Sequence, residues 1–272
     1  TRLSRRRAGA YLLLAIASIV VLVPFLWTLY ASFVKQDVDL GTFPGTADAY
    51  WTGHYQDILT TSLMGRWWLN SIVVTLTILV GNLALNTMAG YALARVNFPG
   101  RKIALGLVLG TMMLPPQVLF EPIYTMVIQF DWLNTYRGLI LPFLVNPFGV
   151  FLMRQFFVGM PQELDDAASL DGLGPLGVFY RVALPIAWPA IAAQAIFIFV
   201  WNWNTFVFPS VLATSPEMFT LPVGIYQITH TTFTNHVAQS MAGVVLATVP
   251  ALLVFAVLQR RFIETLAGTA KG

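Results

Sequence analysis

Six long apolar stretches limit what this chain can fold into. A helix needs about 20 mostly apolar residues to cross the hydrocarbon core of a membrane. Composition agrees with lipid as the solvent, because 57% of the 272 residues are hydrophobic and only 10% are charged, whereas a soluble domain carries roughly 25% charged residues. We therefore expect an all-α, polytopic membrane protein that forms a single domain over residues 1–272 and has six transmembrane helices. The predicted spans are 11–33, 68–94, 103–128, 138–157, 188–212 and 240–259.

The 15 basic residues predict the orientation of these spans. With the N-terminus in the cytoplasm, most of them flank the inner ends of the spans, and the inverted topology would reverse the ratio. The positive-inside rule therefore places both termini and the segment 158–187 in the cytoplasm, and the segments 34–67 and 213–239 outside. Because these residues serve as anchors at the lipid bilayer, nucleic-acid binding is not needed to explain the net charge of +3. The inner set is Arg2, Arg5, Arg6, Arg7, Arg95, Arg101, Lys102, Arg154, Arg181, Arg260, Arg261 and Lys271, and the outer set is Lys35, Arg66 and Arg137.

Motifs for catalysis and metal binding are missing from the sequence. There are no cysteines, and the histidines, His54, His230 and His236, form no His-Glu-x-x-His pair. A G-x-x-x-x-G-K-[ST] phosphate loop is absent, and so is a Gly-x-Ser-x-Gly elbow. We therefore expect no catalytic residue, no metal site and no cofactor in this chain, and an intramembrane enzyme is disfavoured. If transport is driven by ATP, partner subunits must hydrolyse it.

The inner segment from Gly159 reads GMPQELDDAASLDGLGPLGVFYRVALP and predicts two short helices. Carboxylates favour the positive end of a helix, Gly172 is typical of a helix stop, and Pro175 suits the start of the second helix. Small alanines would let the first helix enter a groove closely while its acids pair with a basic partner. An amphipathic connector is the competing interpretation. The candidate docking residues are Glu163, Asp165, Asp166, Ala167, Ala168, Asp171 and Gly172.

A family resemblance adds to this reading. The run D-A-A-S-L-D-G over 166–172, followed by Leu184-Pro185, resembles the E-A-A-x-x-D-G…L-P loop of ABC importer permeases. One departure is Asp166, where the family usually has Glu, so the charge is kept and the side chain is one methylene shorter. The likeness covers nearly the whole chain and points to the maltose-type carbohydrate subfamily. Its other segments are 134–142, 151–157, 203–224 and 259–272.

The resemblance implies an ABC importer permease fold and a role as half of a translocation pathway in the cytoplasmic membrane of a bacterium or archaeon. In such permeases the inner loop 158–187 forms a coupling helix held in a groove of the ATPase. The implied partners are two ATPase subunits that bind ATP and Mg, a second and non-identical permease, and an external solute-binding protein that meets the outer loops. The implied substrate is a sugar or oligosaccharide. Glycerophosphodiesters are the alternative within the same subfamily.

Polar residues inside the spans are candidates for the pathway, because burying them in a membrane is costly. In the second span Asn82 and Asn86 are one helical turn apart and therefore share a face. In the fifth span amides alternate with aromatic rings, a combination that suits the hydroxyls and C–H faces of sugars. Hydrogen bonding between helices is the competing interpretation for these amides. The remaining candidates are Glu121, Trp201, Asn202, Trp203 and Asn204.

Glu121 is the carboxylate that we place within a span. It follows the Pro115-Pro116 break, and a broken backbone is tolerated at depth where it faces protein or water. It could reach the substrate path, or it could be hydrated near the outer surface. A stand-alone secondary transporter is a further alternative for the whole chain, although such folds usually carry internal repeats, and none is evident here.

Overall fold

The computed structural model describes residues 2–35, 50–232 and 237–269, and the regular elements in these ranges are helices. Val34 and Tyr50 form an isolated antiparallel bridge. Residues 36–49 and 233–236, which belong to the two predicted outer loops, lie outside the described residues. The chain divides into two compact units, and each is described by itself: unit 1 comprises 1–65 and 221–250, and unit 2 comprises 66–220 and 251–272.

Unit 1 begins with a long apolar helix, α1 (Arg2–Ala31), which contains Pro24. The short helices α2 (Gly53–Thr61) and α13 (Leu221–Gln227) lie in the segments that we predicted as outer loops. The last helix, α14 (Val237–Thr269), begins in this unit and contains Pro250 at the boundary. Gln239 on α14 donates a 3.2 Å hydrogen bond to the Asp57 carboxylate on α2, which joins the two sequence segments of unit 1.

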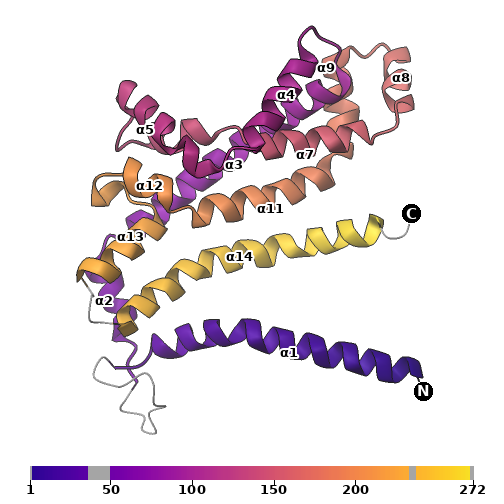
Figure 1. The fold of residues 1–272 in the computed structure, drawn as a ribbon. Coiled ribbons are helices and arrows are strands. Elements are labelled where there is room, and N and C mark those ends of the chain that lie inside the picture. The colour runs from indigo at the N-terminus through magenta and orange to yellow at the C-terminus, as the bar shows by residue number, and fades with distance from the viewer. Residues whose placement is uncertain (1, 36–49, 233–236, 270–272) are drawn as a thin grey trace. The chain divides into compact units, whose positions relative to one another are not determined.

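Unit 2 is built around one long helix, α3 (Met64–Arg95), and two helices that lie side by side, α7 (Pro147–Val158) and α11 (Trp188–Asn204) (Figure 1). In Figure 1, α5 and α12 lie at one end of the unit, and α8 and α9 lie at the other. The remaining helices of the unit are α4 (Arg101–Met112), α5 (Phe120–Gln129), α6 (Tyr136–Ile140), α8 (Glu163–Leu170), α9 (Pro175–Val178), α10 (Leu184–Ile186) and α12 (Val207–Leu212).

Apolar packing holds unit 2 together at two places. Near α8, Tyr91 of α3 packs against Phe157 of α7 and Phe179, which begins the π-helical turn after α9, with ring centroids 5.3 and 4.9 Å apart. Towards the other end, a second buried cluster joins α3 to the helices α5, α6 and α12 through Val74, Val127, Leu139 and Leu212, among others. Each cluster draws on helices that are far apart in sequence, so it fixes the arrangement from which the polar sites are built.

Three of the predicted spans correspond to helices long and apolar enough to cross a membrane: Tyr11–Ala31, Met64–Arg95 and Tyr136–Val158. The predicted stretch 240–259 lies within α14, which is described as helix up to Thr269. The number of spans and the cytoplasmic side of both termini stay predictions.

Besides 138–157, which consists of α6, the 3-10 turn Leu141–Phe143 and α7, two further predicted stretches are not continuous helices. The stretch 103–128 forms α4 and a second helical segment, Pro116–Gln129, bent by 103°. The break falls at Pro115 and Pro116, since proline has no N–H to donate to a helix. The stretch 188–212 also differs from a single span, because α11 ends at Asn204, Thr205 is extended, and α12 is separate. Instead, Trp188–Asn204 forms a pair with Pro175–Ile186, bent by 73°.

Candidate functional site

The first candidate site is the helix α8, whose ends follow from its sequence. Glu163, Asp165 and Asp166 lie in its first turn, where their charges oppose the positive helix end. At the other end, Gly172 adopts φ +81°, donates to Ser169, and is followed by Leu173, which donates to Ala168. These paired bonds close the helix as a Schellman motif. The predicted stop at Gly172 is therefore confirmed, and so is the start of α9 at Pro175.

The side chains of α8 separate into two faces. Ala168 is buried and Asp165 is half-buried, so this face lies against unit 2. The other predicted coupling residues, Glu163, Asp166, Ala167, Asp171 and Gly172, are exposed. Leu170 is 89% exposed on the open side, and the neighbouring Leu176 of α9 is exposed as well. We call this open side the outer face of α8; it combines acidic with apolar side chains.

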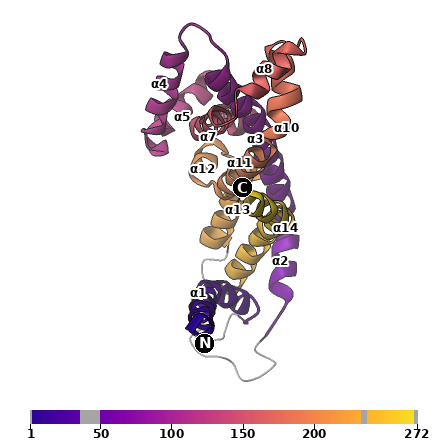
Figure 2. The same cartoon turned by 90° about the vertical axis from the view of Figure 1, so that its right-hand side faces the viewer.

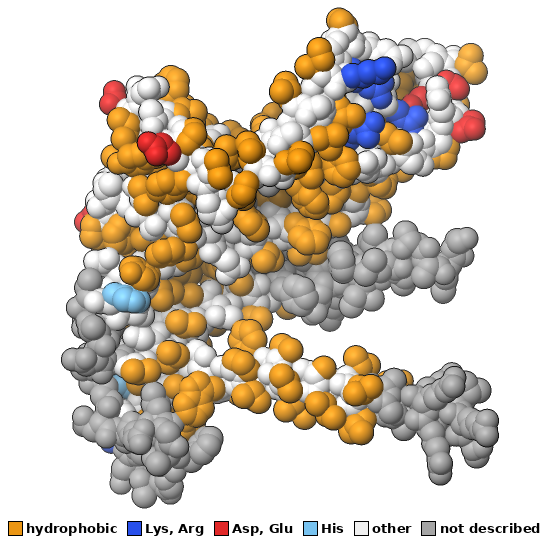
Figure 3. Space-filling model, in the orientation of Figure 1, with side chains coloured by type: hydrophobic (Ala, Val, Ile, Leu, Met, Phe, Trp, Pro, Cys, Tyr) orange, Lys and Arg blue, Asp and Glu red, His pale blue; other side chains and the backbone are white. Residues whose placement is uncertain are grey.

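Charge is concentrated around this end of unit 2. Figure 3 shows acidic side chains over α8 and a group of Lys and Arg side chains beside them. Figure 2, viewed from the α8 end, shows α8 and α10 together, and α8 contacts α9 and the turn Phe179–Ala183. The helix is thus attached along one side to the rest of the unit.

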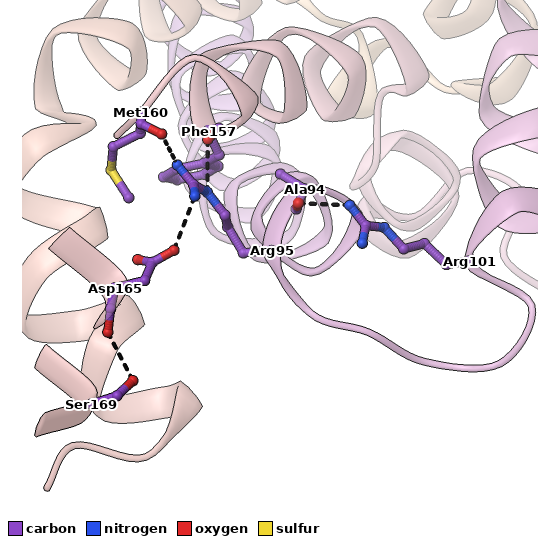
Figure 4. Close-up of polar contacts among 7 residues, drawn as sticks. All are labelled: Ala94, Arg95, Arg101, Phe157, Met160, Asp165 and Ser169. Carbon is purple, nitrogen blue, oxygen red and sulfur yellow. Dashed lines mark hydrogen bonds and ion pairs between the residues drawn. The ribbon is translucent and has the colours of Figure 1, made fainter. Parts of the chain in front are cut away.

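Arg95, the last residue of α3, joins α8 to two other elements (Figure 4). Its Nη1 atom lies 3.1 Å from Oδ2 of Asp165 on α8. Its Nε donates to the carbonyl of Phe157 near the end of α7, at 2.9 Å, and its Nη2 donates to the carbonyl of Met160. Sequence reasoning gave Arg95 only the role of a charge at the inner end of a span, because the pairing with Asp165 depends on the tertiary fold.

Arg101, the first residue of α4, also forms hydrogen bonds with the end of α3. Its guanidinium donates to the carbonyl of Leu93 at 2.8 Å. It also donates to the carbonyl of Ala94 at 2.6 Å, as Figure 4 shows. These carbonyls belong to the last turn of α3, where a helix has no partners of its own for them. A cation at a helix C-terminus also opposes the negative end of the helix dipole. The turn between α3 and α4 is held by these contacts.

The second candidate site is a cavity of about 660 Å³ within unit 2. It is an open cavity lined by α3, the bend before α5, and segments from α5, α6, α7, α11 and α12, and the described residues that line it include no charged side chain. The polar lining residues are Ser71, Thr75, Asn82, Gln117, Asn146, Asn202, Asn204, Thr205 and Thr220, and the aromatic ones are Phe143, Phe197, Trp201, Phe206 and Phe208.

The structure brings together four of the predicted pathway residues at this cavity: Asn82, Trp201, Asn202 and Asn204. The ring of Trp201 is 65% exposed. The amides of Asn202 and Asn204 each donate at 2.8 Å to the carbonyl one turn earlier, of Ile198 and Val200. Neutral hydrogen-bonding groups therefore lie beside an accessible aromatic face.

The other three predicted pathway residues lie elsewhere. Trp203 is 4% exposed and stacks on Phe199, with ring centroids 5.6 Å apart. Glu121 is exposed in the first turn of α5 and does not line the cavity. Asn86 is fully buried one turn beyond Asn82.

Asn82 and Asn86 also bond helices together. Asn82 Nδ2 donates to the Ile78 carbonyl on its own helix and, at 2.7 Å, to the carbonyl of Phe143 after α6. Asn86 Nδ2 donates to the Asn82 Oδ1, and Asn86 Oδ1 accepts from the backbone N–H of Asn146, which caps α7. These contacts fit the competing interpretation in which the two amides connect helices.

The described residues thus form an all-helical fold, and unit 2 has a short acidic helix at one end and a cavity with an uncharged lining among its longer helices. A family model described as "Binding-protein-dependent transport system inner membrane component" matches residues 86–267, and the chain belongs to this family.

Curated relatives include the "Arabinooligosaccharides transport system permease protein AraQ" of Halalkalibacterium halodurans, 39% identical over 77% of this chain and 75% of the relative. The "Diacetylchitobiose uptake system permease protein NgcG" of Streptomyces coelicolor is 33% identical over 94% of this chain and 86% of the relative. Among solved structures, a bacterial ABC transporter that imports the acidic polysaccharide alginate contains a chain with a TM-score of 0.78 and 22% identity, over 93% of this chain and 94% of that one. This similarity shows the ABC importer permease fold.

Proposed function

We propose that this chain is the permease subunit of a binding-protein-dependent ABC importer for a sugar or oligosaccharide, and that it forms half of the translocation pathway. Family membership supports the importer class. The substrate class is supported by relatives named for arabinooligosaccharides, for diacetylchitobiose and, in Bacillus subtilis, for maltodextrin. Family membership also favours this class over the secondary transporter.

The observation that carries the substrate class is the neutral lining of the cavity. Sugars present hydroxyls that pair with amides and C–H faces that pack on aromatic rings. Asn202 and Asn204 beside the exposed ring of Trp201 offer both kinds of contact. A cavity of about 660 Å³ is within the usual size range of ligand sites, about 300–1,000 Å³.

A phosphorylated glycerol derivative is the second candidate substrate. The "sn-glycerol-3-phosphate transport system permease protein UgpE" of Pectobacterium atrosepticum is 29% identical over 97% of this chain and 99% of the relative. Phosphate is preferentially recognised by Arg or Lys, and the described residues that line the cavity include neither. The lining therefore favours an uncharged sugar over a glycerophosphodiester or glycerol phosphate.

The energy for transport comes, in this proposal, from separate subunits, since this sequence has no phosphate-binding loop. Two ATPase subunits, which bind ATP and Mg, dock on the loop 158–187 at the outer face of α8. A second, non-identical permease completes the pathway, and a solute-binding protein meets the outer loops 34–67 and 213–239. The complex resides in the cytoplasmic membrane of a bacterium or archaeon.

Transport by the purified complex tests this proposal. The complex is isolated through an affinity tag on this chain, reconstituted in liposomes, and supplied with its binding protein, ATP and a panel of labelled oligosaccharides, monosaccharides and glycerol phosphates. We expect uptake of a neutral sugar that needs both ATP and the binding protein. Uptake by this chain alone under an ion gradient would contradict the proposal, and exclusive uptake of a phosphorylated substrate would contradict the substrate class.

A further inference from the structure

We propose that Arg95 is a positioning residue of the transport cycle, and that its ion pair with Asp165 transmits the displacement of α8 to α3 and α7. The proposal rests on the proposed function, in which an ATPase moves α8. The proposal concerns the side of α8 that carries Asp165 and Ala168. This side is distinct from the outer face of α8, which is offered to a partner.

The guanidinium of Arg95 makes three connections with its three nitrogens. Nη1 pairs with Asp165 on α8, Nε bonds Phe157 near the end of α7, and Nη2 bonds Met160 between the two helices. The side chain itself extends from the end of α3 (Figure 4). One planar group therefore fixes the mutual position of α3, α7 and α8, which a lysine, with a single nitrogen, could not reproduce.

Burial makes this ion pair stronger than an ordinary surface contact. The Arg95 side chain is 11% exposed and that of Asp165 is 20% exposed, whereas freely exposed pairs contribute little because water screens them. The second carboxylate oxygen of Asp165, Oδ1, is buried and accepts no hydrogen bond from the described residues. Moving α8 away from Arg95 would leave this partly buried carboxylate without its cation, which is strongly unfavourable.

The two faces of α8 therefore have different roles. Glu163, Asp166 and Leu170 are exposed on the outer face, whereas Asp165 faces Arg95. One turn before Arg95, Tyr91 packs on Phe157 and Phe179. This apolar contact joins α3 to α7 and to the turn after α9, and the ion pair lies next to it along α3. A displacement of α8 by a partner bound to its outer face is therefore transmitted to α3 and α7 through Arg95.

The first experiment compares Arg95→Gln with Arg154→Gln in the reconstituted complex. Both substitutions remove one positive charge from the same end of unit 2, but the contact shown for the Arg154 side chain is only a 3.5 Å one to the adjacent Gln155. We expect Arg95→Gln to retain its ATPase subunits on purification while the amount of sugar imported per ATP hydrolysed falls about tenfold, the scale of one lost hydrogen bond to a charged group. Arg154→Gln should keep the ratio of the unsubstituted complex. Equal ratios for the two variants would overturn the proposal.

A second experiment restores the link by chemistry, since the chain has no cysteine of its own. In the double variant Arg95→Cys/Asp165→Cys, a reducible thiol-to-thiol cross-linker should reconnect α3 with α8. We expect the import per ATP to be low when the linker is cleaved and to rise again when it is attached, which a purely structural defect would not do. Failure to cross-link, or a cross-link without recovery, would overturn the proposal. If the unsubstituted complex itself shows no ATP-dependent uptake, the proposed function fails; if only these variants behave otherwise than expected, the role of Arg95 alone fails.

Discussion

Gly149 of α7 lies directly against Asn86 of α3: a Cβ atom at Gly149 would lie 2.2 Å from the Asn86 Nδ2 and 2.3 Å from the Gln194 Nε2. Asn86 and Gln194 are both buried, so neither amide can move into solvent to make room. The absence of a side chain at residue 149 is therefore what allows α3, α7 and α11 to approach one another around the cavity.

The first prediction concerns this contact. Gly149→Ala should lower the free energy of unfolding by about 1–3 kcal/mol, because an added methyl group overpacks a closed helix crossing. Thermal unfolding of the purified complex in detergent measures the loss. Gly106→Ala is the matched control, since Gly106 is also in a helix interior and an added Cβ there would meet nothing within 4 Å. A Gly149→Ala variant as stable as the control would contradict the close contact.

A second prediction separates the two tryptophans of α11. Trp201→Ala should reduce sugar uptake with little change in stability, because Trp201 lines the cavity and is largely exposed. Trp203→Ala should instead destabilise the complex by about 3–5 kcal/mol, because Trp203 is buried against Phe199. Uptake kinetics and melting curves, measured on both variants, check this. If Trp201→Ala destabilised the complex and Trp203→Ala reduced uptake instead, Trp201 would not belong to the pathway.

A third prediction distinguishes the amides of α3 from those of α11. Asn82→Ala should cost stability of about 0.6–2 kcal/mol, because its side chain bonds the carbonyl of Phe143 across helices. Asn202→Ala should chiefly raise the sugar concentration needed for half-maximal uptake, because its own bond is to Ile198 within the same helix. Melting temperatures and concentration dependence of uptake decide between them. If both variants changed stability and uptake to the same extent, Asn82 and Asn202 would not have these separate roles in packing and in sugar binding.

The fourth prediction concerns the end of α8. Gly172→Ala should strain the left-handed backbone at φ +81°, at a cost of about 1–2 kcal/mol, and thereby distort the cap and weaken coupling of ATP hydrolysis to uptake. Gly174→Ala is the control, because its φ is −73° and an added Cβ would meet nothing within 4 Å. Coupled ATPase and uptake assays compare the pair. If Gly172→Ala couples as well as Gly174→Ala, the geometry of the cap is not required.

The features that sequence reasoning predicted best are those with local causes. The apolar stretch 68–94 lies within α3, Gly172 closes α8, and Pro175 opens α9, because hydropathy, left-handed backbone and proline each act over a few residues. The break at Pro115 and Pro116 was visible as well, but a bend of 103° depends on what the two arms pack against.

The features that sequence reasoning could not supply depend on the fold. The Arg95–Asp165 pair joins residues 70 positions apart, and no periodicity reports such a contact. The alternation of Trp and Asn in α11 identified a suitable chemistry, yet only the helix orientation separates Trp201, which lines the cavity, from Trp203, which is buried in packing.

The exposure of α1 has a consequence for how this chain can vary. The side chains from Tyr11 to Trp27 are all exposed, and the ring contact described for this stretch joins Trp27 to Tyr30 of the same helix. Where such a side chain faces lipid, Leu, Ile, Val and Phe are accepted almost equally, so the position is constrained in hydrophobicity rather than in shape. Gly149, where an added methyl group would overpack the helix crossing, is instead constrained in the size of its side chain.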